Sequence, residues 1–378
     1  MAHAQVDDLT EFLDQWERAL SEPDRIYKYH ALRASCAQVR GRFGEALNHW
    51  ANSLTAAGET TIDSLALHSR LGDAHRLASR YDEAADHYTR AMALASDRRL
   101  RQTPAAAARC ERELGRATLG LAKLKRLRCA YPAALALYRR AAEVFGAFRD
   151  EYGLIEADFG LGEVQRLQSN WLLSFRSYRR SLERALGQGN RERYAYALWG
   201  IGEIHRLTGR YGWALATHAE GAEACLKVGD MRSYGWAELG MAETHRTRGA
   251  LDDALVHATR ALKEFADAGS TTEVAHSKLS LAETRRLMAG RDHLGDVALD
   301  SYDEVLELYQ RRGMDHCVVQ AQLAKAAALI TLGRHTEGMH VLDQAEQRAV
   351  EHGLPEARSQ ARALCRASAT PFVQLNFP

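Results

Sequence analysis

Four glutamate–arginine pairs recur in this 378-residue chain at a constant interval of forty residues. Each pair stands in a similar phrase, LGEVQRL, IGEIHRL, MAETHRT or LAETRRL. The pairs are Glu163/Arg166, Glu203/Arg206, Glu243/Arg246 and Glu283/Arg286. A carboxylate and a guanidinium three residues apart share one face of a helix, where they attract each other. The same groups could bind a charged ligand, so the pairs are either a binding surface or contacts that hold a scaffold together.

The pairs belong to a longer repeat that predicts two antiparallel helices in each unit. Each unit also carries a bulky residue followed three positions later by a small one. The bulky residues are Tyr81, Tyr131, Trp171, Tyr211 and Leu251, and the small ones are Ala84, Ala134, Ser174, Ala214 and Ala254. Small residues let two helices approach closely, and we expect the bulky residue to fill the gap at the turn. Turn sequences such as TGRYG and ADAGST separate the helices and the units.

Further copies extend the repeat in both directions. They cover residues 35–54, 71–92, 121–141 and 324–345, with an inserted loop, SDRRLRQTP, and a four-residue insert near Asp292–Gly295. We therefore expect an all-α solenoid of eight helix pairs, with a capping helix at 6–20 and a last helix at 355–366. The predicted organisation is a capping region over 1–29, a solenoid over 30–366 and a tail, SATPFVQLNFP, within 367–378.

Composition supports a helical, cytoplasmic protein. The chain has only six prolines, which favours helix throughout. Its six cysteines are scattered and form no CxxC pair, so they indicate neither a disulfide framework nor a zinc site. No run of about 18 apolar residues exists, and the N-terminus lacks the pattern of a signal peptide. We expect no membrane span, no metal and no cofactor.

The repeated core, LG followed by G-x-Y-x-x-A, resembles the tetratricopeptide repeat family over roughly residues 30–350. Its forty-residue step resembles the longer variants of that family, such as kinesin-light-chain-type arrays and bacterial peptide-pheromone receptors. The resemblance implies a right-handed superhelix in which the first helix of each pair lines the concave face. It does not imply one function, because this fold carries many different ligands.

If the resemblance holds, the groove-facing positions are the Glu, the Arg, and the residues four and seven before the Glu, which share one helical face. The candidate ligand-binding residues are Phe159, Glu163, Arg166, Tyr196, Trp199, Glu203, Arg206, Trp236, Glu243 and Arg246. Aromatic side chains supply apolar contact area, and charges fix orientation. Two alternatives stay open: the aromatics fill space between helices, and the charges form a ladder between repeats. We number the units that carry Glu163, Glu203, Glu243 and Glu283 four to seven. We expect units four and five to contact a ligand and units six and seven to be structural.

One segment is strongly basic. Residues 98–140 contain twelve Lys or Arg and two acidic residues, although the whole chain has a net charge of only +1. Such a block is typical of an anion-binding face, with Arg116, Lys123 and Arg126 predicted to lie in the groove. A solvated helix face, or pairing with acids elsewhere in the chain, is the alternative. The absence of a recognition-helix or basic–aromatic strand motif argues against specific nucleic-acid recognition.

No catalytic motif stands out, and we assign no catalytic residue. His75, His205 and His245 share one column, which we expect to face the partner helix rather than a metal. The sequence predicts a scaffold whose groove binds an acidic or zwitterionic peptide, a partner protein or a small charged molecule. The alternative is an enzyme that acts on a small charged metabolite, with Glu, His or Tyr as the acid–base group.

Overall fold

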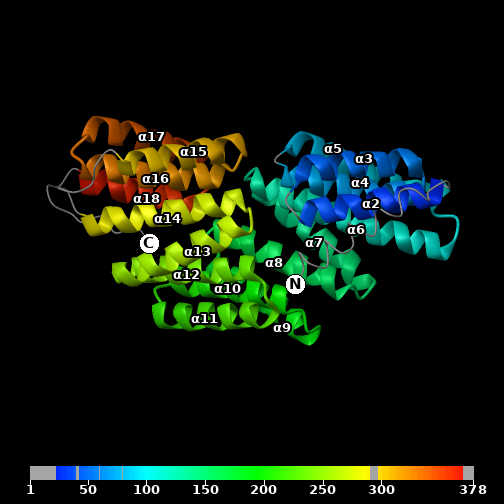
Figure 1. Ribbon diagram of the computed structural model, residues 1–378, viewed down its shortest axis with the longest axis horizontal. Helices are drawn as coiled ribbons and strands as arrows, with labels where there is room; N and C mark the ends of the chain where they lie inside the picture. The colour runs from blue at the N-terminus through cyan, green and yellow to red at the C-terminus, as the bar shows by residue number, and fades with distance from the viewer. Residues whose placement is uncertain (1–22, 40–41, 59, 79, 290–296, 369–378) are drawn as a thin grey trace. The chain divides into compact units, whose positions relative to one another are not determined.

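The computed structural model describes residues 23–39, 42–58, 60–78, 80–289 and 297–368. Within these ranges the regular elements are all helices, and no strand occurs, as the sequence predicts (Figure 1). The capping helix expected at 6–20, the insert near Asp292–Gly295 and most of the expected tail lie outside the described residues. None of the described helices is both long enough and apolar enough to cross a membrane.

Eight antiparallel helix pairs follow one another along the chain, and a single helix, α18, follows the last pair. The first helices of the pairs are α2 (Pro23–Val39), α4 (Ile62–Leu77), α6 (Pro104–Leu127), α8 (Glu151–Leu167), α10 (Arg191–Leu207), α12 (Met231–Thr247), α14 (Thr271–Ala289) and α16 (Asp315–Thr331). The second helices are α3 (Phe43–Ala57), α5 (Tyr81–Ser96), α7 (Tyr131–Ala147), α9 (Trp171–Gly187), α11 (Tyr211–Val228), α13 (Leu251–Asp267), α15 (Val297–Arg311) and α17 (His335–Glu351). A short 3-10 turn, η1 (Arg98–Leu100), precedes α6, and α18 spans Pro355–Ser368.

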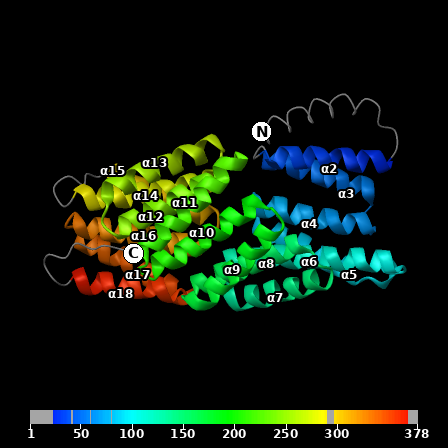
Figure 2. The same cartoon turned by 90° about the horizontal axis from the view of Figure 1, so that it is seen from below.

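The chain divides into two compact units. The N-terminal unit comprises Met1–Arg126 and Tyr131–Ala157, and the C-terminal unit comprises Leu127–Ala130 and Asp158–Pro378. In the C-terminal unit each first helix packs against its own second helix and against the neighbouring first helices, in the order α10, α12, α14, α16 and α18 (Figure 2). This serial packing brings residues forty positions apart onto adjacent helices.

The helix ends are spaced as regularly as the sequence repeat. A residue with positive φ ends successive helices at positions 129, 149, 169, 189, 209, 229, 249 and 269, twenty residues apart. Most of these residues are glycines, which adopt this conformation without a steric penalty. Among the described residues the next such glycine is Gly313, four residues beyond 309, which is two twenty-residue steps after Gly269. This shift matches the four-residue insert that the sequence places between units seven and eight.

A buried ring from each of several second helices lies between two glycines of adjacent first helices. The ring of Tyr178 is fully buried, and a Cβ atom added at Gly162 or Gly200 would lie 2.7 or 2.5 Å from it. Tyr178 lies seven residues beyond Trp171, the residue we expected to fill the gap, and Trp171 is only half-buried. The expected small residue, Ser174, is fully buried. The close helix approach is therefore confirmed, but a different aromatic residue fills it.

Adding a methyl group at this contact should be costly. We expect Gly200→Ala to destabilise the protein by about 1–3 kcal/mol, because the new Cβ would overlap the Tyr178 ring and a packed core relaxes poorly. Gly212→Ala is the matched control, since no atom lies within 4 Å of its added Cβ, and alanine favours helix. Urea unfolding compares the two variants. Equal stability of both would show that the Tyr178 contact is loose.

Candidate functional site

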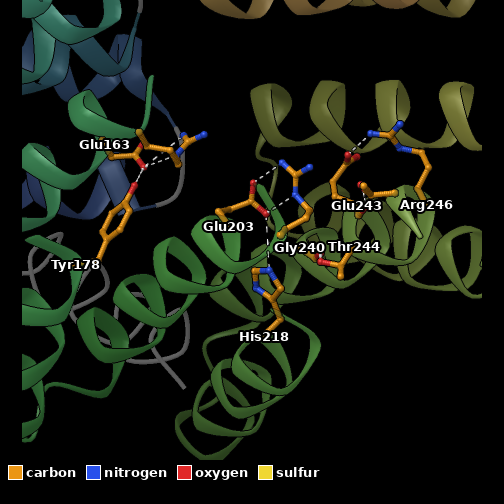
Figure 3. A network of polar contacts seen from close by, with 11 residues as sticks. Glu163, Tyr178, Glu203, His218, Gly240, Glu243, Thr244 and Arg246 are labelled. Atoms are coloured by element: carbon orange, nitrogen blue, oxygen red, sulfur yellow. Dashed lines mark hydrogen bonds and ion pairs between the residues drawn. The ribbon is translucent and has the colours of Figure 1, made fainter. Parts of the chain in front are cut away.

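The glutamate and arginine of each recurring pair bond to each other within one helix. Figure 3 shows this for the pairs that contain Glu163, Glu203 and Glu243. In α10, Arg206 donates to both carboxylate oxygens of Glu203, at 2.9 and 3.2 Å. In α14, Arg286 holds Glu283 in the same bidentate way, at 2.9 and 3.0 Å. These four side chains are all less than one tenth exposed. They are buried ion pairs, in which loss of one partner would leave an uncompensated charge.

Second helices add further partners to the glutamates. The hydroxyl of Tyr178 on α9 donates to Glu163 (Figure 3). The hydroxyl of Tyr302 on α15 donates to Glu283 at 2.6 Å. Burial and the adjacent carboxylate raise the pKa of each tyrosine, so both keep their protons. Unit five has His218 at this position, with Nε2 3.7 Å from Glu203. The units therefore differ in how tightly the second helix holds the glutamate.

Neighbouring units also interact electrostatically. Burial by itself would lower the pKa of Arg206, but Glu203 in the same helix and Glu243 in the next raise it above its usual value. Arg166 is affected in the same way by Glu163 and by Glu203 of the next unit. Positive and negative groups thus alternate from one first helix to the next. This attraction between units favours the inter-repeat ladder that the sequence left open as one interpretation, although the ion pairs themselves each lie within one helix.

Two tryptophans and an arginine come together on three first helices. Trp199 and Trp236 meet edge to face, with ring centroids 5.3 Å apart. The guanidinium of Arg166 lies 5.5 Å from the centroid of Trp199, within the range of a cation–π interaction. Trp236 also packs on Phe265 of α13, so part of its surface fills space between helices. Both indoles are nevertheless only half-buried and keep accessible surface.

The aromatic row continues in both directions. In one direction, Phe159 of α8 contacts Tyr196 of α10, with ring centroids 6.1 Å apart. On the other side Trp236 contacts His276, at 5.6 Å, and the Tyr309 hydroxyl lies 2.6 Å from Nδ1 of that histidine. Burial lowers the pKa of His276, which favours a neutral ring. The predicted aromatic stripe therefore forms two sets of contacts, one between Phe159 and Tyr196 and one that runs from Trp199 on α10 to Tyr309 on α15.

The histidine column faces the second helices, as expected. The ring contacts are His75–His87, His205–Phe175 and His245–His257. Burial lowers the pKa of all three column histidines. The pairs His75–His87 and His245–His257 are stacked, and His205 meets Phe175 edge to face, so the column belongs to the packing between first and second helices.

Much of the basic segment is paired with carboxylates of the N-terminal unit. Arg116 bonds to Glu113 at 2.5 Å, and Lys123 bonds to Glu156 at 2.7 Å. Two further pairs are Arg101–Glu111 and Arg109–Asp63. The internal pairing that the sequence offered as an alternative therefore takes up a large part of the positive charge. An anionic ligand at Arg116 or Lys123 would have to compete with Glu113 or Glu156, whereas Arg126 lies near the end of α6.

Sequence reasoning missed the residues whose role depends on a second helix or on the last helix. Tyr178 and Tyr302 carry a signal in hindsight, because a large ring recurs opposite the glycines of the repeat. Glu356 of α18 carries none. It lies within electrostatic reach of Arg206 and Arg166, which are 150 or more residues away in sequence. No repeat pattern indicates this carboxylate, because α18 follows the last helix pair.

No protein-family model and no curated protein matches this sequence. Aspartyl phosphate phosphatase F from Bacillus subtilis is 10% identical, with 91% of this chain and 89% of that chain covered and a TM-score of 0.58. A Rap protein complexed with competence and sporulation factor is 13% identical over 80% of each chain, with a TM-score of 0.54. NprR in complex with its cognate peptide NprX is 14% identical over 75% of this chain and 81% of that chain, with a TM-score of 0.51. At these identities the similarity establishes the fold: this chain is a helical solenoid of the tetratricopeptide type.

Proposed function

We propose that the C-terminal unit binds a peptide, or an extended segment of a partner protein, across the first helices α8, α10 and α12. The observation that carries this proposal is the half-buried Trp199–Trp236 contact beside buried ion pairs. Clustered tryptophans with accessible surface are typical of the residues that dominate binding energy. NprR, which has the same fold, was solved with its cognate peptide, and this supports a peptide ligand here.

The extent of the aromatic row favours a peptide over a small molecule. Packed helices lie about 8–10 Å apart, so contacts across three first helices span about 20 Å. An extended chain rises about 3.3 Å per residue, which corresponds to about six residues. We infer that Phe159, Tyr196, Trp199 and Trp236 supply the apolar contacts.

The ion pairs divide between structure and binding. Glu283 is already held by Arg286 and Tyr302, so this network satisfies both of its carboxylate oxygens. Arg206 differs, because its Nη1 is buried and has no hydrogen-bond partner among the described residues. A buried guanidinium nitrogen with unused donors is costly unless a ligand or water accepts from it. We therefore assign unit seven to the scaffold and unit five to the site.

Trp199→Ala should weaken peptide binding by at least about tenfold, the effect expected of a central aromatic contact. Fluorescence anisotropy with pools of fluorescein-labelled hexapeptides measures the affinity. Trp213→Ala is the matched control, since that indole lies on α11, a second helix, and is 69% exposed. Loss of binding in Trp213→Ala, with Trp199→Ala unaffected, would move the site to the second helices. Absence of binding by every pool would refute a peptide-binding function.

A further inference from the structure

Two of the eight residues in the recurring glutamate–arginine pairs remain accessible to solvent. The side chain of Arg166 on α8 is 18% exposed, and that of Glu243 on α12 is 23% exposed. The other six side chains of the four pairs are each less than one tenth exposed. The two accessible groups have opposite charge and belong to different units. A ligand can therefore reach a guanidinium on α8 and a carboxylate on α12.

Arg166 is held by its glutamate more weakly than Arg206 is. Its Nε and Nη2 atoms both lie 3.4 Å from the same oxygen, Oε1 of Glu163. The hydroxyl of Tyr178 donates to that oxygen as well, so three donors share one acceptor. Arg206 instead donates to both oxygens of Glu203, at 2.9 and 3.2 Å. Because hydrogen bonds weaken as they lengthen, Arg166 can exchange its long bonds for shorter ones to an acceptor of the ligand.

Glu243 lacks a partner that the other units provide, because unit six departs from the repeat. The second-helix rings beside the glutamates of units four, five and seven are those of Tyr178, His218 and Tyr302. The equivalent residue of unit six is Ala258, which is fully buried and has no side-chain donor. Arg246 donates to Oε2 of Glu243 from within α12. The second helix therefore supplies no donor at this position, and a donor of the ligand can take its place.

The two accessible charges lie at opposite ends of the tryptophan pair. The guanidinium of Arg166 is 5.5 Å from the ring centroid of Trp199, and Trp199 meets Trp236 at 5.3 Å. Glu243 follows Trp236 by seven residues, so both lie on one face of α12. The site thus has a cationic end on α8, an apolar centre and an anionic end on α12.

We propose that the peptide is zwitterionic and binds in one direction, with an acidic side chain on Arg166 and a basic side chain on Glu243. This inference rests on the proposed function, and it specifies the charges of the ligand and their order. The two helices are separated by α10 alone, which corresponds to about 16–20 Å. An extended peptide spans this distance in about five or six residues. Hydrogen bonds between ionised partners are stronger than neutral ones, so the two contacts can select a peptide with both charges.

The test uses eight pools of hexapeptides that are acetylated at the N-terminus and labelled with fluorescein at the C-terminus. One end residue is aspartate or asparagine, the other is lysine or norleucine, and each combination is made in both orders. Anisotropy titrations compare wild type with Arg166→Gln and Glu243→Gln, each of which removes one charge. Arg179→Gln on α9 and Glu223→Gln on α11 are the matched controls, because these charged residues lie on second helices and are 64% and 68% exposed.

In one of the two orders, we expect wild type and both controls to prefer aspartate over asparagine and lysine over norleucine, each by about tenfold. That order gives the direction of the bound peptide. Arg166→Gln should lose only the preference for aspartate, and Glu243→Gln only the preference for lysine. Affinity for the pool without either charge should stay within about twofold of wild type in both variants.

The inference would be overturned if aspartate were still preferred in Arg166→Gln, or lysine in Glu243→Gln. Equal affinities of wild type for charged and uncharged pools, or equal preferences in both orders, would also overturn it and leave peptide binding established. Each variant tests a different preference, so a folding defect in one leaves the other as the test. Failure of all eight pools to bind would instead refute the proposed function.

Discussion

Replacing Glu283 with alanine should destabilise the protein by about 3–5 kcal/mol, the cost of breaking a buried ion pair from one side. The guanidinium of Arg286 is only 3% exposed, and Glu283 is its bidentate partner. The change also removes the acceptor of the Tyr302 hydroxyl. Urea unfolding of the full chain, followed by circular dichroism at neutral pH, measures the loss.

Two further variants serve as references for the stability loss of Glu283→Ala. Glu307→Ala breaks an exposed pair with Arg311, in which both side chains are about two thirds exposed, so it should cost less than about 1 kcal/mol. The double substitution Glu283→Leu with Arg286→Met removes both charges and should restore most of the lost stability. If Glu283→Ala cost no more than Glu307→Ala, the columns would not be the structural contacts that we infer for unit seven.

His218 should make stability depend on pH between about 7 and 4. Burial lowers the pKa of His218 to about 4, against about 6.5 in the unfolded chain. Below pH 6.5 the unfolded chain therefore binds a proton that the folded protein rejects, and stability falls as the pH is lowered. This linkage should cost about 2 kcal/mol between pH 7.5 and 5, approaching about 3 kcal/mol at pH 4.

His218→Tyr isolates the contribution of His218 to the pH dependence of stability. It introduces the residue type that unit four has at the equivalent position, Tyr178. The ring of His218 lies between Gly202 and Gly240 as Tyr178 lies between two glycines, so a tyrosine should fit and reach Glu203. Urea unfolding at pH 7.5 and 5 should show a smaller loss in this variant than in wild type, by about 2 kcal/mol. Equal losses in both proteins would show that His218 is protonated without cost in the folded state.

The helix pairs could be predicted because their causes are local. Small residues at fixed offsets, such as Ala84 and Ala214, permit close packing, and both are fully buried. Turn glycines recur every twenty residues from Gly189 to Gly269, where the chain leaves each helix with a positive φ. A repeated sequence places these signals in every unit. The eight helix pairs of the described residues could therefore be predicted by counting the repeats.

The candidate site could be predicted in part. Glu203 and Arg206 had to meet, because a three-residue offset places them on one helical face. The stripe of Trp199 and Trp236 could be predicted because they stand four and seven residues before the glutamates of adjacent units, two positions that share one helical face. The groove role assigned to Arg116 and Lys123 was weakened by acids that the repeat pattern did not align with them, Glu113 and Glu156.

Only the tertiary structure decided how deeply these groups are buried and which charges stay unpaired. Burial sums the contributions of helices far apart in sequence, so the spacing of Glu283 and Arg286 gave no indication that both are nearly inaccessible. Where Glu356 lies relative to the first helices depends on how the curvature of the repeats accumulates from α10 to α18. Each helix pair sets a small rotation locally, but the position of the last helix relative to α10 is the product of all the rotations between them.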